Sequence, residues 1–212
     1  MTAPRTASCP NCGAPVRFLW AQAVQTTCVY CKAVLVRRDL DLETIGLQAH
    51  FPETGSPIQL GTEGKWRNKS FVVVGRLAYK WDRGRWNEWH CRMNDGKSAW
   101  LSDAQLEYAM SEAIEPDAVM PAATSLRVGS RYMWHDREYE VATMTQASYL
   151  GTEGDLPFTS TALGTSLFVD LQSPDGGFAT LDYSDKEAVL YVGEYCDFES
   201  LAFKNLREFE GW

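Results

Sequence analysis

Two short runs of sequence, Cys9-Pro10-Asn11-Cys12 and Cys28-Val29-Tyr30-Cys31, decide how the N-terminal part of the chain folds. Each C-x-x-C run lets one tight turn offer two sulfur atoms to an ion, and two such turns complete a tetrahedron. The segment between the runs is long enough for a β-hairpin that brings them together. Because four thiolates leave no coordination position open, we expect one structural Zn²⁺ in a zinc ribbon over residues 1–40.

Other uses of these cysteines fit the sequence less well. The ribbon holds few apolar side chains, so its fold should depend on the ion. A redox dithiol would need a βαβ pattern nearby, and the sequence shows none. The remaining cysteines, Cys91 and Cys196, stand among apolar residues close to expected strands, which predicts buried side chains rather than ligands.

Beyond the ribbon, the chain contains two copies of one β-rich pattern, at residues 56–113 and 124–204. When the copies are aligned without gaps, Trp66 lies over Trp134, between an apolar-x-apolar-Gly start and an alternating apolar strand. Self-similarity of this kind indicates duplication of a small supersecondary unit. The sequence therefore predicts a mainly β protein, in which the zinc ribbon is followed by two tandem small β-barrel-like units.

Turn signals divide each copy into strands. Asn94-Asp95-Gly96 and Asp175-Gly176-Gly177 each separate two apolar runs, and an Asp-Gly pair supplies the positive φ angles of a tight hairpin. Residues 103–112 fit either a capped helix or a strand, and the strand is favoured because the second copy has a strand pattern there. Gln146–Thr165, rich in Gly, Ser and Thr, is predicted to be a long loop.

The net charge of −8 is unevenly distributed along the 212 residues. Residues 1–38 carry several bases and no acid, so the remainder is strongly acidic. We therefore expect the molecule as a whole to repel nucleic acid, while the ribbon could attract an acidic partner. No apolar run is long enough to cross a bilayer and no apolar leader precedes Cys9, which predicts a cytoplasmic protein without a transmembrane segment.

A candidate binding surface lies within residues 65–92, where basic side chains are interleaved with aromatic ones. Such a surface could follow a phosphate backbone and stack bases. The residues that we single out are Arg83, Arg85, Trp86, Glu88 and His90. The alternative is that the tryptophans pack the core, as strand alternation predicts for Trp89, while Lys and Arg face water. No motif of a hydrolase, a zinc protease or a phosphate-binding loop occurs, so we expect no catalytic site.

Four motifs carry a resemblance to a known family: Trp86-Asn87-Glu88-Trp89, the Asp-Gly hairpin, Trp100-Leu101 and Tyr191-Val192-Gly193-Glu194-Tyr195. Over roughly residues 56–205 the chain resembles the bacterial family known as domain of unknown function 4178. The resemblance implies duplicated small β units, preceded in some members by a zinc ribbon. It also implies an accessory role, since genes of this family often neighbour those for polyamine-synthesis and membrane-stress proteins. The second copy departs from the pattern at Leu167-Phe168-Val169-Asp170, so a site built on the Trp-x-Glu-Trp strand is carried only to the first copy.

Together, these observations predict a non-catalytic cytoplasmic accessory or scaffold protein that binds another protein. The alternative is a nucleic-acid-binding protein that uses the basic ribbon and residues 65–92. A weaker alternative is an enzyme or binder that acts on a small cation such as a polyamine, because the second half of the chain is acidic.

Overall fold

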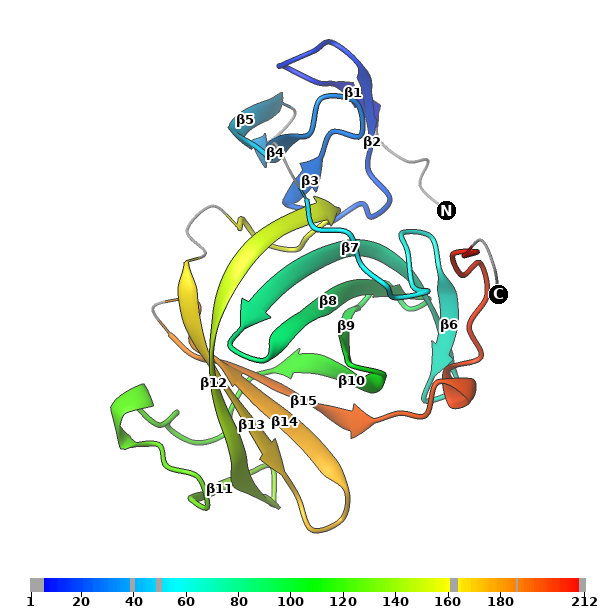
Figure 1. The fold of residues 1–212 in the computed structure, drawn as a ribbon. Coiled ribbons are helices and arrows are strands. Elements are labelled where there is room, and N and C mark those ends of the chain that lie inside the picture. The colour runs from blue at the N-terminus through cyan, green and yellow to red at the C-terminus, as the bar shows by residue number, and fades with distance from the viewer. Residues whose placement is uncertain (1–5, 39–40, 49–50, 161–163, 186, 210–212) are drawn as a thin grey trace.

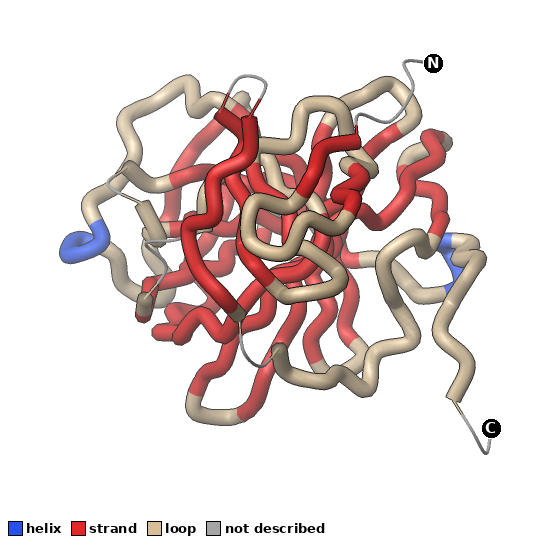
Figure 2. Tube along the Cα trace, turned by 90° about the horizontal axis from the view of Figure 1, so that it is seen from above, coloured by secondary structure: helices blue, strands red, loops and turns tan. Residues whose placement is uncertain are grey.

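The computed structural model describes residues 6–38, 41–48, 51–160, 164–185 and 187–209. The described chain is mainly β, and its helical content is two short 3₁₀ turns that lie at opposite sides of the molecule (Figure 2). Residues 1–5 and 39–40 of the predicted ribbon, and 161–163 of the predicted loop, lie outside the described residues.

The elements follow one another along the chain as β1 (Thr6–Ser8), β2 (Pro15–Arg17), β3 (Gln25–Thr27), β4 (Ala33–Arg38), β5 (Asp41–Leu47), β6 (Glu63–Trp66), β7 (Lys69–Trp81), β8 (Gly84–Met93), β9 (Ser98–Ala104), β10 (Glu107–Ile114), η1 (Ala123–Ser125), β11 (Arg131–Trp134), β12 (Arg137–Gly154), β13 (Thr165–Gln172), β14 (Gly177–Asp182), β15 (Val189–Tyr195) and η2 (Glu199–Leu201).

The strands from β6 to β15 form one antiparallel sheet that closes on itself (Figure 1). β7 to β10 form one meander and β12 to β15 form another. The two meanders pair with each other at both edges, β10 with β15 and β7 with β12. This corrects the expectation of two separate barrel-like units: each copy supplies one half of a shared sheet. A lone meander would leave unpaired N–H and C=O groups along both of its edges, and the other copy satisfies them.

The two halves keep the equivalences that the repeat indicates. The hairpins β6–β7 and β11–β12 turn at Arg67-Asn68 and His135-Asp136, where all the residues have positive φ. Each half has an apolar cluster of its own, and the repeated tryptophan, Trp66 or Trp134, is buried in it. The repeat therefore reflects matching packing as well as matching turns.

The predicted strand at residues 103–112 and the predicted loop at Gln146–Thr165 have different outcomes. Residues 103–112 are strand rather than helix, as predicted, but they belong to two strands: β9 ends at Ala104 and β10 begins at Glu107 after a turn. The predicted loop Gln146–Thr165 is wrong in its first part, because β12 continues to Gly154. Residues 148–154 are held as strand by pairing with β7, a partner from the other copy that a local pattern cannot reveal.

The N-terminal module consists of a two-stranded sheet, β1 with β2, and a three-stranded sheet, β3 to β5. β5 pairs with β4 and extends the module to Leu47, past the expected end at residue 40. The module lies at one end of the closed sheet, next to β7 and β12 (Figure 1). None of the helical segments among the described residues has the length and apolar character to cross a membrane.

Candidate functional site

The four paired cysteines come together in the N-terminal module. Their sulfur atoms all lie within 4.8 Å of one another, with 3.7 Å between those of Cys9 and Cys31 and 3.9 Å between those of Cys12 and Cys28. A tetrahedral site with Zn–S near 2.3 Å has sulfur–sulfur edges of about 3.8 Å. The cluster can therefore hold one metal ion, and it is consistent with a zinc ribbon.

The same backbone turn shapes both pairs. The N–H of Gly13 donates to the Cys9 carbonyl at 2.8 Å, and the N–H of Lys32 donates to the Cys28 carbonyl at 3.0 Å. Gly13 and Lys32 both have positive φ, which costs glycine little and lysine more. A hydrogen bond from the Asn11 side chain is the largest of the influences that lower the pKa of Cys31, and it favours the thiolate form of that residue.

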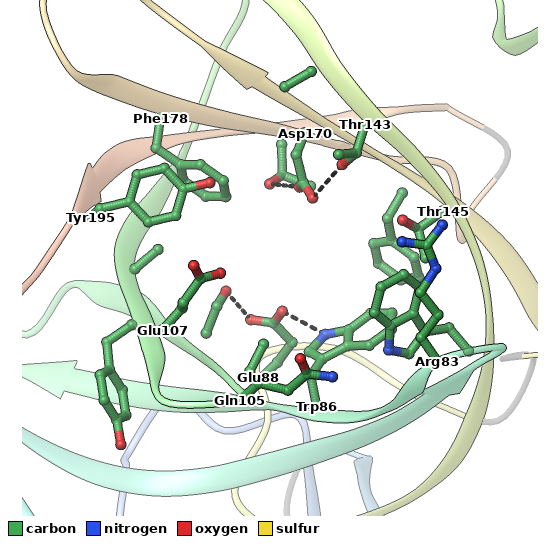
Figure 3. A pocket seen from close by; sticks show the side chains of 18 of the residues that line it. Arg83, Trp86, Glu88, Gln105, Glu107, Thr143, Thr145, Asp170, Phe178 and Tyr195 are labelled. Carbon is green, nitrogen blue, oxygen red and sulfur yellow. Dashed lines mark hydrogen bonds between the residues drawn. The ribbon is translucent and has the colours of Figure 1, made fainter. Parts of the chain in front are cut away.

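The second candidate site is a cavity of about 410 Å³ inside the closed sheet (Figure 3). Strand alternation decides which side chains face it. On β8, Trp89 and Met93 pack into the apolar cluster of the first half, whereas Trp86 and Glu88 line the cavity. The same alternation on β13 places Val169 in the apolar cluster of the second half. Most apolar side chains of these two strands thus pack on the outer face of the sheet, and the inner face carries a mixed lining of polar, aromatic and a few aliphatic side chains.

Glu88 is the most strongly perturbed acid of this lining. Trp86 Nε1 donates to Glu88 Oε1 at 2.9 Å, and Ser102 Oγ donates to Glu88 Oε2 at 2.8 Å. Burial outweighs these two neutral donors and raises the pKa of Glu88 to about 8. Glu88 is half-buried, and its accessible part borders the cavity. Near neutral pH, Glu88 therefore carries a proton unless a cation is close.

Three further carboxyl groups belong to the inner face of the sheet: Asp170, Asp182 and Glu107, of which Glu107 is exposed (Figure 3). Asp170 on β13 lies on the wall opposite Glu88 (Figure 3) and accepts hydrogen bonds from Thr180 at 2.8 Å and Thr143 at 3.1 Å. Asp182 on β14 borders a smaller recess that also reaches Glu88. Burial raises the pKa of both aspartates. Within the described part of the chain, Glu88, Asp170 and Asp182 make no ion pair.

Aromatic rings fill the wall between these acids. Trp86 stacks on Tyr79 with ring centroids 5.2 Å apart, and Phe168 meets Trp86 edge-on at 5.5 Å. Further round the cavity, Phe178 packs against Tyr195 at 4.9 Å. The cavity therefore combines buried carboxyl groups with flat, electron-rich surfaces.

Of the residues singled out from the sequence, Arg83, Arg85, Trp86 and Glu88 all line this one cavity. The two arginines are exposed. Trp86 and Glu88 face the inside of the sheet, whereas the sequence led us to expect an outward surface. The sequence pattern does not indicate that these two side chains point inward, because the inner face exists only once the two copies have closed the sheet.

His90 lies apart from that group. It is fully buried, its Nδ1–H donates to the Asp155 carbonyl at 2.8 Å, and its Nε2 accepts from Ser98 Oγ at 2.8 Å. Burial lowers the pKa of His90 to about 4, so the ring is neutral. Both ring nitrogens are occupied by the protein, which indicates a structural role.

Asp170 was missed by sequence reasoning, which treated the second copy as lacking the motif. Counting back from the Asp-Gly turns at Asp95 and Asp175 places Asp170 at the position of His90 in the first copy. That alignment could have indicated that Asp170 and His90 occupy the same face of equivalent strands in the two copies. It could not have indicated that Asp170 faces Glu88, because the two residues belong to different copies.

Comparison with known proteins gives one result. No curated protein and no solved structure matches the chain significantly. Residues 59–198, more than half of the chain, match the family described as Domain of unknown function (DUF4178). The matched range contains both meanders and leaves out the four-cysteine module. The chain therefore belongs to the DUF4178 family, with a four-cysteine module ahead of the family domain.

Proposed function

We propose that the chain is a non-catalytic binding protein that holds a small organic cation in the cavity inside the closed sheet. The observation that carries this proposal is the pair Glu88 and Asp170, which face the cavity from opposite walls and have only neutral hydrogen-bond donors (Figure 3). Buried carboxyl groups are costly in their charged form unless a cation accompanies them. A ligand with a positive charge would supply that partner.

The walls suit an organic cation better than a bare metal ion. In the described residues the one cluster with metal-ligand geometry is that of the four cysteines, so the acids of the cavity do not converge on a point. The rings of Trp86 and Phe168 line the cavity, and aromatic faces attract ammonium groups. A volume of about 410 Å³ falls in the range of small-ligand pockets.

The two arginines of the lining do not reverse this preference. Arg83 and Arg85 are exposed, so water and salt screen their charges. Glu88 and Asp170 are half-buried inside the closed sheet, where an added charge interacts more strongly. The arginines suit a hydroxyl or another oxygen acceptor at the outer end of the ligand. No described Cys or His lines the cavity, which favours binding over covalent chemistry.

We further propose that the ion held by Cys9, Cys12, Cys28 and Cys31 is Zn²⁺ with a structural role. The support is the all-thiolate donor set at sulfur–sulfur distances of 3.7 and 3.9 Å, which suits a closed tetrahedral shell.

Calorimetry with choline and its neutral isostere 3,3-dimethylbutan-1-ol tests the cavity proposal. We expect the full chain to bind choline, and to bind the isostere at least roughly tenfold more weakly, because only choline carries the charge. Glu88→Gln and Asp170→Asn should each weaken choline binding, whereas Glu138→Gln, at an exposed carboxylate on β12, should not. Equal binding of choline and its isostere, or unchanged binding by both cavity variants, would refute a cation site.

A second candidate, the protein-binding accessory role, has one observation in its favour. Val29 and Tyr30, on the turn between two of the cysteines, are 68% and 66% exposed. Exposed apolar side chains on a rigid turn suit a protein contact. Tyr30→Ser should then abolish recovery of a specific partner from native cells while leaving choline binding intact. The nucleic-acid alternative gains less support, since Arg67 and Lys69 are engaged with carboxylates.

A further inference from the structure

A short piece of chain that we call the plug segment, residues 155–160, lies between the N-terminal module and the aromatic side chains inside the closed sheet. A separate recess of about 40 Å³ adjoins the cavity, shares Glu88 with it and includes Phe158 in its wall. Phe158 stacks on Trp100 with ring centroids 5.8 Å apart, and Leu156 is fully buried in the same aromatic cluster. The plug segment therefore forms part of the wall of this recess, next to the proposed binding site.

The N-terminal module holds the plug segment as though it were a neighbouring strand. The N–H of Leu156 donates to the Gln25 carbonyl at 2.8 Å, and the N–H of Val24 donates to the Leu156 carbonyl at 2.9 Å. The Gln25 side chain accepts from the N–H of Ser160 at 2.8 Å and donates to its hydroxyl at 2.8 Å. Gln25 is fully buried, so none of these bonds is readily exchanged for water.

Asp155 joins the module, the plug segment and the sheet. Its carboxylate accepts from the backbone N–H of Trp20 at 2.8 Å and from the Thr26 hydroxyl Oγ1 at 2.7 Å, and both donors belong to the module. Its backbone carbonyl accepts from His90 on β8. Asp155 is 1% exposed, so loss of the carboxylate would leave two donors of the module buried without a partner.

From these contacts we propose that the four-cysteine module positions the plug segment, so that occupancy of the metal site sets the wall of the recess that shares Glu88 with the cavity, with Asp155 as the positioning residue. This regulation rests on the proposed function of the cavity. Its physical basis is that the module has a small apolar cluster that includes Cys9 and Cys28, and so depends on its ion to stay ordered. When the module loses order, the plug segment loses the bonds to Gln25 and to Trp20.

One backbone amide of the plug segment can serve as an internal reference for hydrogen exchange. The N–H of Asp155 donates to the Val74 carbonyl on β7 at 2.7 Å, a bond that does not involve the module. The N–H groups of Leu156 and Ser160 donate to Gln25 instead. Residue-resolved hydrogen exchange can therefore separate loss of the module contact from general unfolding of the sheet.

The experiment compares four samples of the full chain by NMR-detected hydrogen exchange and choline calorimetry: zinc-loaded, chelator-treated, zinc-loaded Asp155→Ala and zinc-loaded Asp175→Ala. Asp175→Ala is the control, because Asp175 is an exposed aspartate that pairs with Arg137 at the turn between β13 and β14, at the end of the sheet away from the N-terminal module (Figure 1). We expect exchange at Leu156 and Ser160 to rise by roughly tenfold or more after chelation and in Asp155→Ala, with the Asp155 amide changing less. Choline affinity should fall by roughly fivefold or more in the same two samples.

The outcomes separate this inference from the proposal on which it rests. Unchanged exchange at Leu156 and Ser160 in both perturbed samples would overturn the positioning role, even if choline binds. Faster exchange at these two amides without any choline binding, in any sample, would support the contact but refute the cation site. If Asp155→Ala does not fold, Thr26→Val takes its place, since it removes only the hydroxyl donor to Asp155.

Discussion

The protonation of Glu88 offers the most direct test of the cavity as a buried acidic site. Burial raises the pKa of Glu88 from 4.5 to about 8. Between these two values the unfolded chain ionises this carboxyl group while the folded chain keeps it protonated. The stability that the group contributes is thus fully present below pH ~4.5, and it is lost as the pH rises through about 8.

The size of the loss follows from the distance between the two pKa values. Each pKa unit corresponds to about 1.4 kcal/mol, so the ligand-free protein should lose on the order of 3–5 kcal/mol from this group between pH 5 and 9. Glu88→Gln resembles the protonated acid: its amide oxygen can accept from Trp86, and its NH₂ can donate to Ser102. The variant should therefore lack this loss.

Unfolding of both proteins by urea, which is uncharged and so does not compete as a cation, at pH 5, 7 and 9 measures the difference. We expect the free energy of unfolding of Glu88→Gln, relative to that of the wild type, to rise by a few kcal/mol from pH 5 to pH 9. Asp170 and Asp182 remain in both proteins, so their contributions largely cancel in the comparison. Parallel pH profiles of the two proteins would mean that Glu88 titrates normally, and the reasoning on burial would be wrong.

Three further predictions concern the fold and the metal. The purified chain should contain one zinc ion by elemental analysis. Cys12→Ser should lose most of this zinc, and its N-terminal module should lose its ordered structure. A module that is ordered without zinc would contradict this prediction. Gly193→Ala should destabilise the chain by about 1–3 kcal/mol in denaturant unfolding, because the added Cβ would overlap the Met110 carbonyl where the two copies pair. Gly55→Ala is the control and should cost less, because there is open space around Gly55. Trp134→Ala should cost about 3–5 kcal/mol by the same measurement, since this side chain is 2% exposed, and a cost below 1 kcal/mol would rule out its place in the core.

The sequence alone determined the parts of this protein that depend on neighbouring residues. The C-x-x-C spacing brings two sulfur atoms to one turn, and Asp-Gly pairs allow tight hairpins, whatever the rest of the chain does. The matched tryptophans Trp66 and Trp134 revealed the duplication, and strand alternation correctly sent Trp89 into an apolar cluster. The family resemblance rested on similarly local motifs.

Only the tertiary structure decided what the duplication builds. Pairing of β7 with β12 and of β10 with β15 depends on edges more than sixty residues apart in sequence, and no local pattern specifies a partner at that distance. Closure created an inner face, placed Asp170 opposite Glu88, and turned part of a predicted loop into strand. It also brought Gln25 against the plug segment. These features share one physical cause: burial and its effect on charge are properties of the assembled sheet, so a carboxyl group in the sequence carries no sign of them until its surroundings are complete.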